Sequence, residues 1–400
     1  MVADAQRSPA PENRPENTPI WDDARWTPLP SLEGDASCGT CVIGLGGSGL
    51  TVIEELLARG EDVIAIDAAD VASGAAGRNG GFLLAGAYDF YHDAVRLHGR
   101  ERARAIYGAT LGEIHRIAEA APGTVRFTGS RRIAATDAEI DDCKVQMTAM
   151  HADNLACEWY EGDDGVGLHI PVDAAFNPLA RCRILATRAI ERGARVHART
   201  AVTGLSAGRV ETPNGAITCQ RIIVAVDGRL ELLLPELVGR VRTARLQMLA
   251  TAPTTERIVP CPMYYREGYE YWQQLPDGSI AIGGFRDKAG ASEWTSDAHP
   301  TEPVQSMLER FLRDHLGVHA PITHRWAATA AFSDNGLPVL ERVRDGVWAI
   351  GAYSGTGNVI GALAARAVVA AAIEQDYAPA RLLLGPQWTP DGPVGAGAQA

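Results

Sequence analysis

The sequence predicts an α/β protein with two lobes, one built on a parallel sheet and the other on antiparallel strands. Three observations lead to this prediction. A strand–helix–strand pattern spans residues 40–67, and a strand, glycine loop and helix return at 347–373. Between them, the stretch 241–331 reads as longer antiparallel strands with a hairpin signal at 276–278. The parallel lobe is therefore expected to be assembled from separated parts of the chain.

The first pattern contains a glycine motif between a buried strand and a helix. Gly44, Gly46 and Gly49 form G-x-G-x-x-G, and the next strand ends on Asp67. In this arrangement the glycines permit a tight turn, close approach of a pyrophosphate and packing of helix on strand, while the helix start favours an anion. The acid is placed to accept hydrogen bonds from a ribose. The unit predicts a bound dinucleotide, with a ligand-free glycine loop as the alternative.

The remaining elements follow from periodicity and turn residues. Residues 71–86 are too rich in glycine for regular structure and too apolar for a solvated linker. Helices are expected at 96–121, 137–154, 179–192, 302–316 and 358–373. Further strands are expected at 132–135, 195–198, 202–205, 210–212, 217–218, 221–226, 269–275, 279–283, 322–331 and 347–350.

Composition narrows the function. The net charge is −12 and no basic tract stands out, which argues against nucleic acid as a partner. No apolar run reaches the length of a membrane span, since the longest candidate, Val359–Ile373, contains Arg366. The N-terminus lacks a signal pattern, so a cytoplasmic protein is expected. Seven scattered cysteines fit a reducing compartment, and Cys38 and Cys41 lack partners for a zinc site, so no metal is expected.

Four segments together resemble the D-amino-acid-oxidase (DAO) superfamily of FAD-dependent oxidoreductases. They are the unit ending in Asp67, SGAAGRNGGF from Ser73, IIVAVDG at 222–228, and LPVL with GVWAIGAYSGTGN before the last helix. The variant Arg78-Asn79-Gly80-Gly81 looks most like the gamma-glutamylputrescine oxidase branch, with glycine oxidase and sarcosine oxidase as relatives.

The resemblance implies a Rossmann-like FAD-binding domain assembled from separated segments and a β-rich substrate domain with an antiparallel sheet. The expected FAD-binding segments are 36–95, 165–235 and 332–385, and the expected substrate domain comprises 96–164 and 236–331. Residues 1–35 are expected to form a partly disordered N-terminal extension, and residues 386–400 a tail.

The resemblance also assigns residues to FAD. Those expected to hold it are Gly44, Gly46, Gly47, Ser48, Gly49, Asp67, Ala68, Ser73, Arg78, Asn79, Gly80, Gly81, Phe82, Val202, Ala225, Gly228, Gly351, Ser354, Gly355, Thr356, Gly357 and Asn358. Some relatives attach FAD through a cysteine just before the C-terminal segment. Here the stretch from Trp326 to Asn335 has none, so non-covalent FAD is expected.

The chemistry implied is oxidation of a C–N bond in an amine or N-substituted amino acid. Hydride passes to flavin N5, the imine is hydrolysed, and O2 (giving H2O2) or another acceptor reoxidises the flavin. Strand alternation places Tyr269 and Tyr271 on one face and Trp272 on the other, so one face can wall a substrate pocket. Ordinary sheet packing is the alternative for these aromatics, and a solvated surface position is the alternative for Arg286. The expected catalytic group is Arg78, Tyr265, Tyr271 and Arg286.

Two departures from relatives bear on the substrate. Ala330 stands where glycine oxidase carries a carboxylate-binding arginine, and Ala281 aligns with a lysine above the flavin in sarcosine oxidase. They place a simple α-amino acid and rapid reaction with oxygen in doubt. Two other classes stay open: an NAD-dependent dehydrogenase, which leaves the C-terminal glycine loop unexplained, and a non-catalytic dinucleotide-binding sensor.

Overall fold

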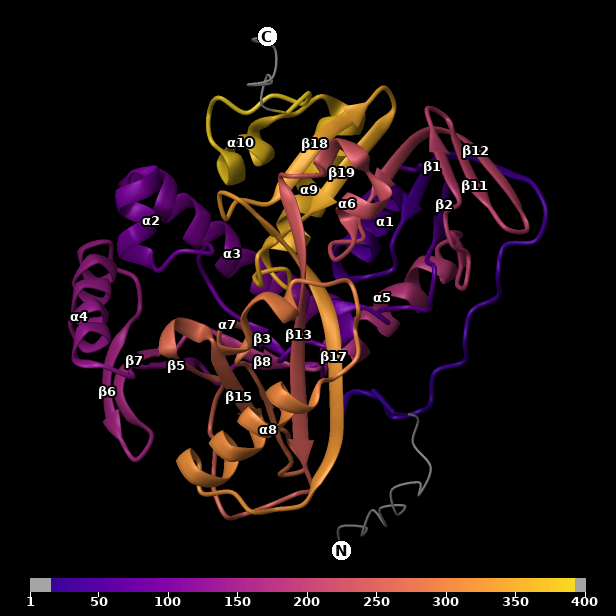
Figure 1. Cartoon of the computed structure of the whole chain (residues 1–400). Coiled ribbons are helices and arrows are strands. Elements are labelled where there is room, and N and C mark those ends of the chain that lie inside the picture. The colour runs from indigo at the N-terminus through magenta and orange to yellow at the C-terminus, as the bar shows by residue number, and fades with distance from the viewer. Residues whose placement is uncertain (1–15, 393–400) are drawn as a thin grey trace, which may run out of the picture.

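A computed structural model of the chain describes residues 16–392. Two eight-stranded sheets and one three-stranded sheet organise them, with helices packed outside (Figure 1). The disorder expected for the first fifteen residues, and the end of the expected tail from residue 393, lie outside the described residues.

The first sheet confirms the predicted α/β class, because its central strands are parallel. In the order β9-β2-β1-β12-β19, neighbouring strands run parallel. These strands are β1 (Ala36–Ile43), β2 (Val63–Ile66), β9 (Arg195–His197), β12 (Gly215–Val224) and β19 (Val347–Gly351). Antiparallel strands extend the sheet, namely β10 (Gly204–Ser206), β11 (Arg209–Thr212) and β18 (Val339–Arg344).

Helices from distant parts of the chain cover one face of this first sheet. Leu50 and Ile53 of α1 share a buried apolar cluster with Leu185 of α5 and Val368 of α9. In Figure 1 the yellow α9 lies beside the indigo α1, so the two ends of the described chain complete one layer. The helices are α1 (Gly47–Ala58), α5 (Pro178–Glu191), α9 (Ile360–Val369) and α10 (Ala378–Leu384).

The second sheet carries the antiparallel strands, but it also contains one parallel pair, Met263–Tyr265 beside Ser130–Ile133. Its order is β17-β13-β16-β15-β14-β5-β7-β6. The strands are β17 (Ile322–Ser333), β13 (Val241–Thr251), β16 (Ile280–Gly283), β15 (Glu270–Gln274), β14 (Met263–Tyr265), β5 (Ser130–Ile133), β7 (Gly165–Ile170) and β6 (Glu158–Gly162). Helix α8 (Glu302–Arg310) and the π turn η5 (Phe311–His315) pack on one face, where Leu308 and Leu312 meet Trp272.

Smaller elements join the two sheets. The three-stranded sheet consists of β3 (Phe82–Leu83), β8 (Ala174–Phe176) and β4 (Val125–Arg126). The other helices are α2 (Tyr91–His98), α3 (Arg100–Ala120), α4 (Asp137–Ala152), α6 (Leu230–Leu233) and α7 (Arg286–Ala289). Short 3₁₀ turns are η1 (Ala75–Gly77), η2 (Pro235–Leu237), η3 (Arg266–Gly268) and η4 (Gly290–Glu293), and η6 (Ala370–Glu374) is a π turn.

Several sequence expectations need correction. The helix expected at 96–121 is two helices, because Gly99 has φ +81° and turns the chain between α2 and α3. The strands expected at 217–218 and 221–226 form one strand, β12, which pairs with β11 at its start and with β19 at its end. Strand β7, inside a range expected in the FAD-binding domain, pairs with β5 and β6 in the second sheet. Within residues 16–392, no helix is both long and apolar enough to cross a membrane.

Candidate functional site

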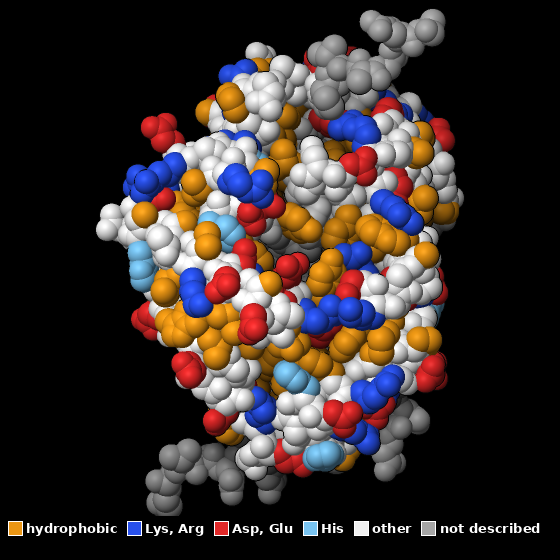
Figure 2. Space-filling model, turned by 60° about the vertical axis from the view of Figure 1, so that its left-hand side comes forward, with side chains coloured by type: hydrophobic (Ala, Val, Ile, Leu, Met, Phe, Trp, Pro, Cys, Tyr) orange, Lys and Arg blue, Asp and Glu red, His pale blue; other side chains and the backbone are white. Residues whose placement is uncertain are grey.

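Two adjoining cavities lie where the lobes meet. The first, here called the glycine-loop cavity, measures about 570 Å³ and is lined by the loop before α1. The second, the aromatic cavity, measures about 420 Å³ and is lined by tyrosines of β14 and β15. Both are lined by Ala75, Arg78, Asn79, Leu246, Ala328, Gly355 and Asn358, so the cavities are continuous there. Figure 2 shows one face of the molecule, on which hydrophobic side chains border a hollow near the centre.

The glycines ahead of α1 shape the first cavity. Gly44 has φ +113°, and a Cβ there would lie 2.5 Å from the carbonyl oxygen of Ala225, so only glycine fits. A Cβ on Gly49 would lie 1.9 Å from the carbonyl oxygen of Gly44, which shows that this glycine lets helix and strand touch. A Cβ on Gly46 would meet only the Cβ of Ala76, at 3.4 Å. Gly46 therefore leaves space open to the cavity.

Asp67 lies at the carboxyl end of β2 and lines the same cavity. Its Oδ2 accepts a hydrogen bond from the Leu45 N–H and its Oδ1 accepts one from the Ala69 N–H, both at 2.8 Å. Burial raises the pKa of this carboxyl above its ordinary value, and the two backbone hydrogen bonds oppose that shift. Each oxygen retains lone pairs for a further donor such as a ribose hydroxyl.

The sequence analysis missed Arg181, a buried cation of α5 in the glycine-loop cavity. Its side chain lies against the start of α1, since a Cβ on Gly47 would be 2.9 Å from Arg181 Nη1. Nη2 donates to Thr51 Oγ1 at 3.4 Å, while Nε is buried without a partner among the described residues. No carboxylate among the described residues forms an ion pair with the Arg181 guanidinium. A buried guanidinium beside a helix N-terminus suits a doubly charged anion such as pyrophosphate.

Arg78 stands where the two cavities meet. Its Nε donates to the Ser73 carbonyl at 2.8 Å, and its Nη1 donates to the carbonyls of Asn17 at 2.8 Å and Ala327 at 3.1 Å. Burial lowers the pKa of the guanidinium, and the field of Asp22 opposes that shift. All of its hydrogen-bond acceptors are neutral oxygens. Arg78 therefore brings a positive charge to this boundary without a carboxylate in direct contact.

An N-terminal segment also closes this boundary. Asn17 lines the glycine-loop cavity, and its Oδ1 accepts from Arg78 Nη1 at 3.1 Å and from the Ala327 N–H at 2.9 Å. Trp21 is buried and donates from Nε1 to the Asn79 carbonyl at 2.9 Å. The part of the N-terminal extension that is described thus belongs to the wall of the site.

The C-terminal loop completes the wall through unusual backbone geometry. Ala352, Ser354 and Gly355 all have positive φ, of +53°, +52° and +94°. Asp227 holds the loop, because its Oδ1 accepts from the Tyr353 N–H at 3.2 Å. Asn358 then links this loop to Asn79 and to the start of β3 by donating to Asn79 Oδ1 at 3.0 Å and to the Phe82 carbonyl at 2.9 Å.

The structure brings most of the expected cofactor residues to the two cavities. In the glycine-loop cavity lie Gly44, Gly46, Gly47, Ser48, Asp67, Ala68, Ser73, Arg78, Asn79, Val202, Ala225, Gly228, Gly355, Gly357 and Asn358. Gly80, Phe82, Ser354 and Thr356 line the aromatic cavity instead. Gly49, Gly81 and Gly351 line neither; a Cβ on each would press on Gly44, on Phe176 or on Leu230 respectively, so they serve close packing.

The lining of the aromatic cavity differs from our expectation at one of the expected catalytic residues. Tyr264, Tyr269 and Tyr271 line it, whereas Tyr265 does not. Side chains alternate along β14, so Tyr265 turns to the opposite face and packs against Phe311 and His315, with ring centroids 5.8 and 4.9 Å apart. Tyr264 therefore occupies the place that we expected for Tyr265.

Arg286, at the start of α7, reaches the aromatic cavity as expected. Its guanidinium carbon lies 4.4 Å from the ring centroid of Phe332 and 5.1 Å from that of Trp294. No hydrogen bond or ion pair joins its side chain to another of residues 16–392. Two aromatic faces thus hold a cation whose five N–H donors remain available.

The two alanines that depart from relatives have different surroundings. Ala330 lines the glycine-loop cavity and lies on the same face of β17 as Ala328 and Phe332, which line the aromatic cavity. Ala281 is buried in a small apolar cluster with Met248 and Trp326 and lines neither cavity. The β-strand residues that line both cavities are Leu246 of β13 and Ala328 of β17, and Ala281 is not among them.

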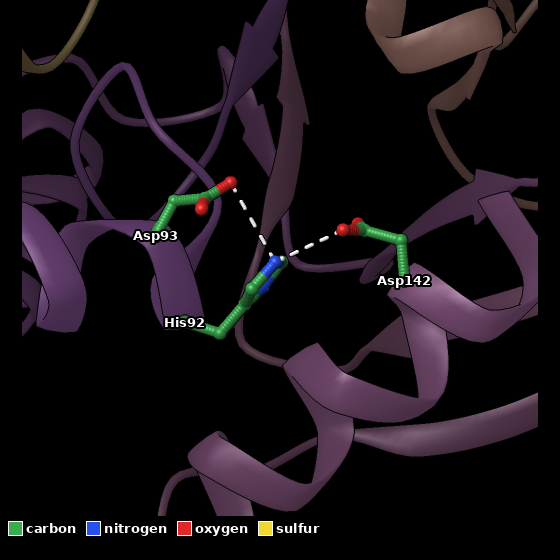
Figure 3. Close-up of side chains that lie close together, drawn as sticks. All are labelled: His92, Asp93 and Asp142. Atoms are coloured by element: carbon green, nitrogen blue, oxygen red, sulfur yellow. Dashed lines mark hydrogen bonds and ion pairs between the residues drawn. The ribbon is translucent and has the colours of Figure 1, made fainter. Parts of the chain in front are cut away.

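A separate polar cluster lies between α2 and α4 (Figure 3). His92 Nε2 is 3.0 Å from Asp142 Oδ1 and 3.5 Å from Asp93 Oδ2, close enough for the three side chains to share a metal ion. Arg132, however, places its Nη2 2.7 Å from Asp142 Oδ2. This guanidinium already supplies the cluster with a cation, so the contacts form a polar network that joins β5 to α2 and α4.

Comparison with known protein families and individual proteins gave matches over most of the chain. A family model described as FAD dependent oxidoreductase (DAO) matches residues 40–371. A gamma-glutamylputrescine oxidoreductase of Escherichia coli (strain K12) is 24% identical over 380 residues, covering 86% of this chain and 85% of that protein. A probable oxidoreductase OrdL of Rhizobium meliloti (strain 1021) is 25% identical over 364 residues, covering 83% and 82%.

Solved structures show the same fold at lower identity. L-proline dehydrogenase from P. horikoshii has a TM-score of 0.71 and 18% identity, with 88% of this chain and 98% of that chain covered. Glycine oxidase from Geobacillus kaustophilus has a TM-score of 0.69 and 18% identity, with 86% and 98% covered. The similarity therefore extends over both lobes.

Proposed function

The chain belongs to the family of FAD-dependent oxidoreductases, and from that premise we propose that it oxidises a C–N bond of an amine or amino-acid derivative larger than glycine, where its two cavities meet. Family membership identifies FAD as the cofactor, where the sequence had left an NAD-dependent dehydrogenase open. It also identifies the chain as an enzyme of the amine and amino-acid oxidoreductase type rather than a non-catalytic sensor.

The residues of the glycine-loop cavity fit FAD. Gly46 leaves room for a pyrophosphate, Arg181 offers it an unpaired buried cation, and Asp67 has lone pairs for a ribose. No cysteine or histidine is among the described residues that line either cavity, in agreement with non-covalent FAD. When bound, FAD supplies the hydride acceptor for the carbon next to the substrate nitrogen.

Arg286 is the single observation that carries the substrate proposal. A guanidinium that lies against two adjoining aromatic rings, without an acidic partner, is suited to a bidentate contact with a carboxylate. Tyr269 and Tyr271 supply aromatic surface to the same cavity, which suits an alkyl chain or an amine. The substrate would then be an amine that carries a carboxylate group.

Arg78 would act on the bound cofactor ring, whereas Arg286 would act on the substrate. Its charge lies at the boundary of the two cavities and has only neutral hydrogen-bond acceptors, so it can stabilise negative charge that develops on a bound ring. No lysine is among the described residues that line either cavity. We therefore propose an acceptor other than oxygen for the electrons, with O2 as the competing acceptor that reoxidation in air would reveal.

The test pairs each amino-acid derivative with the amine that lacks its carboxylate. Anaerobic reduction of the flavin should favour the carboxylate-bearing member in the wild type, and Arg286→Met should remove that preference. A hydrogen bond to a charged group is worth about 1.5–3 kcal/mol, so we expect a loss of roughly tenfold to a hundredfold or more. Arg286→Lys should keep part of the preference.

Arg242→Met is the matched control, because the Arg242 guanidinium carbon also stacks on Trp294, at 4.2 Å, but Arg242 lines neither cavity. It should behave like the wild type. A preference that survives in Arg286→Met, or disappears equally in Arg242→Met, would contradict the role given to Arg286.

A further inference from the structure

The aromatic cavity has a second polar region, formed by Asp173, Tyr107 and Tyr264. Asp173 lies between β7 and β8 and is 2% exposed. Its Oδ2 accepts from Ser130 Oγ at 2.6 Å, and its Oδ1 accepts from the Ala85 N–H at 2.8 Å. These two contacts hold the carboxylate at the cavity wall.

Both acidic and phenolic groups in this region have unused hydrogen-bonding capacity. No arginine, lysine or histidine among residues 16–392 forms an ion pair or hydrogen bond with the side chain of Asp173. The carboxylate can accept about four hydrogen bonds in all, of which two are made. The hydroxyl of Tyr107, a residue 4% exposed, is buried without any partner in the described part of the chain. Because buried polar groups are almost always satisfied, the pair indicates a missing polar ligand group.

The electrostatics favour a positive or N–H-bearing ligand. Burial raises the pKa of Asp173 to about 7, against the opposing effect of the Ser130 and Ala85 hydrogen bonds. Burial also raises the pKa of Tyr107 and of Tyr264, and the field of Asp173 adds to both shifts. A cation entering this region would stabilise the ionised carboxylate that its surroundings disfavour.

This region is distinct from the surroundings of Arg286. Tyr264 of β14 and Tyr271 of β15 face one another in register. The field of Arg286 acts on Tyr271, whereas that of Asp173 acts on Tyr264. The guanidinium and the carboxylate are not paired with each other, so the wall of this cavity presents two separate charges of opposite sign.

We propose that Asp173, Tyr107 and Tyr264 form a subsite for an ammonium or similar N–H-donating group, remote from the C–N bond that is oxidised. The proposal rests on the proposed amine oxidation and narrows its substrate class to extended amines that carry a second nitrogen. Asp173 and the Tyr107 oxygen accept hydrogen bonds from that group, and the ring of Tyr264 adds a cation–π surface.

Asp173→Asn tests the charge while preserving the local contacts. The asparagine oxygen can still accept from the Ala85 N–H, and its Nδ2 can donate to Ser130 Oγ. The holoenzyme is titrated anaerobically with linear diamines of graded length and with monoamines of matching length. Two signals are followed, namely the rate of flavin bleaching and the shift in thermal midpoint.

In the wild type the diamine should bind more tightly than its matched monoamine at one favoured length. In Asp173→Asn that preference should fall by roughly tenfold or more, as for loss of a hydrogen bond to a charged group. Tyr107→Phe should lower it by a smaller factor. Glu267→Gln is the control, since Glu267 is an exposed acid lining the same cavity, and should leave the preference unchanged.

Equal preference for diamine and monoamine in wild type and Asp173→Asn would overturn the subsite. A preference lost in Glu267→Gln but kept in Asp173→Asn would also overturn it, by placing the cation at the exposed acid. If no amine bleaches the flavin, the proposed oxidation fails, but the thermal shift by diamines still decides whether Asp173 binds a cation.

Discussion

Replacing Gly46 or Gly49 by alanine separates cofactor binding from folding. A Cβ on Gly46 makes an ordinary contact of 3.4 Å with the Cβ of Ala76, and its φ of −82° is open to any residue. Alanine stabilises by restricting the unfolded chain, by about 0.4–1 kcal/mol. It is a poorer N-cap than glycine by a similar amount, about 0.5–1 kcal/mol. Because these effects offset each other, Gly46→Ala should fold with a stability within about 1 kcal/mol of the wild-type apoprotein.

The same methyl group occupies the space through which the pyrophosphate would approach the backbone. Each hydrogen bond lost to a charged phosphate oxygen costs about 1.5–3 kcal/mol. We therefore expect FAD affinity to fall by roughly tenfold to a hundredfold for each such bond. The assay is titration of apoprotein with FAD, followed by flavin fluorescence, beside the thermal midpoint of the apoprotein.

Gly49→Ala is the paired variant. Its Cβ would lie 1.9 Å from the Gly44 carbonyl oxygen, so strand or helix must shift. Overpacking of this kind costs about 1–3 kcal/mol or more, and the apoprotein itself should be destabilised. Wild-type FAD affinity in Gly46→Ala, or equal loss of apoprotein stability in both variants, would refute the reasoning.

Three further predictions concern charged groups of the site. Arg181→Met should weaken binding of FAD and of ADP by roughly tenfold or more, as for a lost charged hydrogen bond, while leaving adenosine binding unchanged; equal loss for adenosine would contradict a pyrophosphate contact. Arg78→Ala should slow flavin reduction more than it weakens FAD binding. Asn17→Ala, which removes a neutral partner of Arg78, should slow flavin reduction less. Unchanged reduction kinetics in Arg78→Ala would make Arg78 part of the scaffold. Folding raises the pKa of Asp173 from 3.8 to about 7. The wild type should therefore lose stability relative to Asp173→Asn as pH rises from about 4 to about 7. Unfolding curves measured at several pH values would check this.

The parts of the site that local sequence determines could be predicted. Gly44, Gly46 and Asp67 belong to one continuous strand–helix–strand unit, whose contacts are set by neighbours along the chain. The loop from Gly351 to Gly357 likewise joins a strand to the helix that follows it. Most of the residues expected to hold FAD therefore line a cavity, although the sequence alone does not show how the lobes are arranged.

The parts of the site that depend on packing between distant segments could not be predicted from the sequence. Strand alternation separates Tyr264 from Tyr265, but only the position of η5 beneath the second sheet shows which face is covered. Arg181 reads as one more polar residue of an amphipathic helix, and it becomes a buried cation only because α5 packs against α1. Asp173 reads as a turn residue, and its burial depends on the meeting of β5, β7 and the loop of Ala85.

The most direct test of amine oxidation is anaerobic mixing of the wild-type holoenzyme with amines and amino-acid derivatives while the oxidised flavin absorbance is recorded. The account predicts bleaching by an amine that carries a carboxylate, with little bleaching by glycine. Air should then restore the oxidised spectrum slowly. Fastest bleaching by glycine, with rapid peroxide formation, would contradict the substrate and the acceptor proposed here. A flavin that no amine reduces would contradict the central claim.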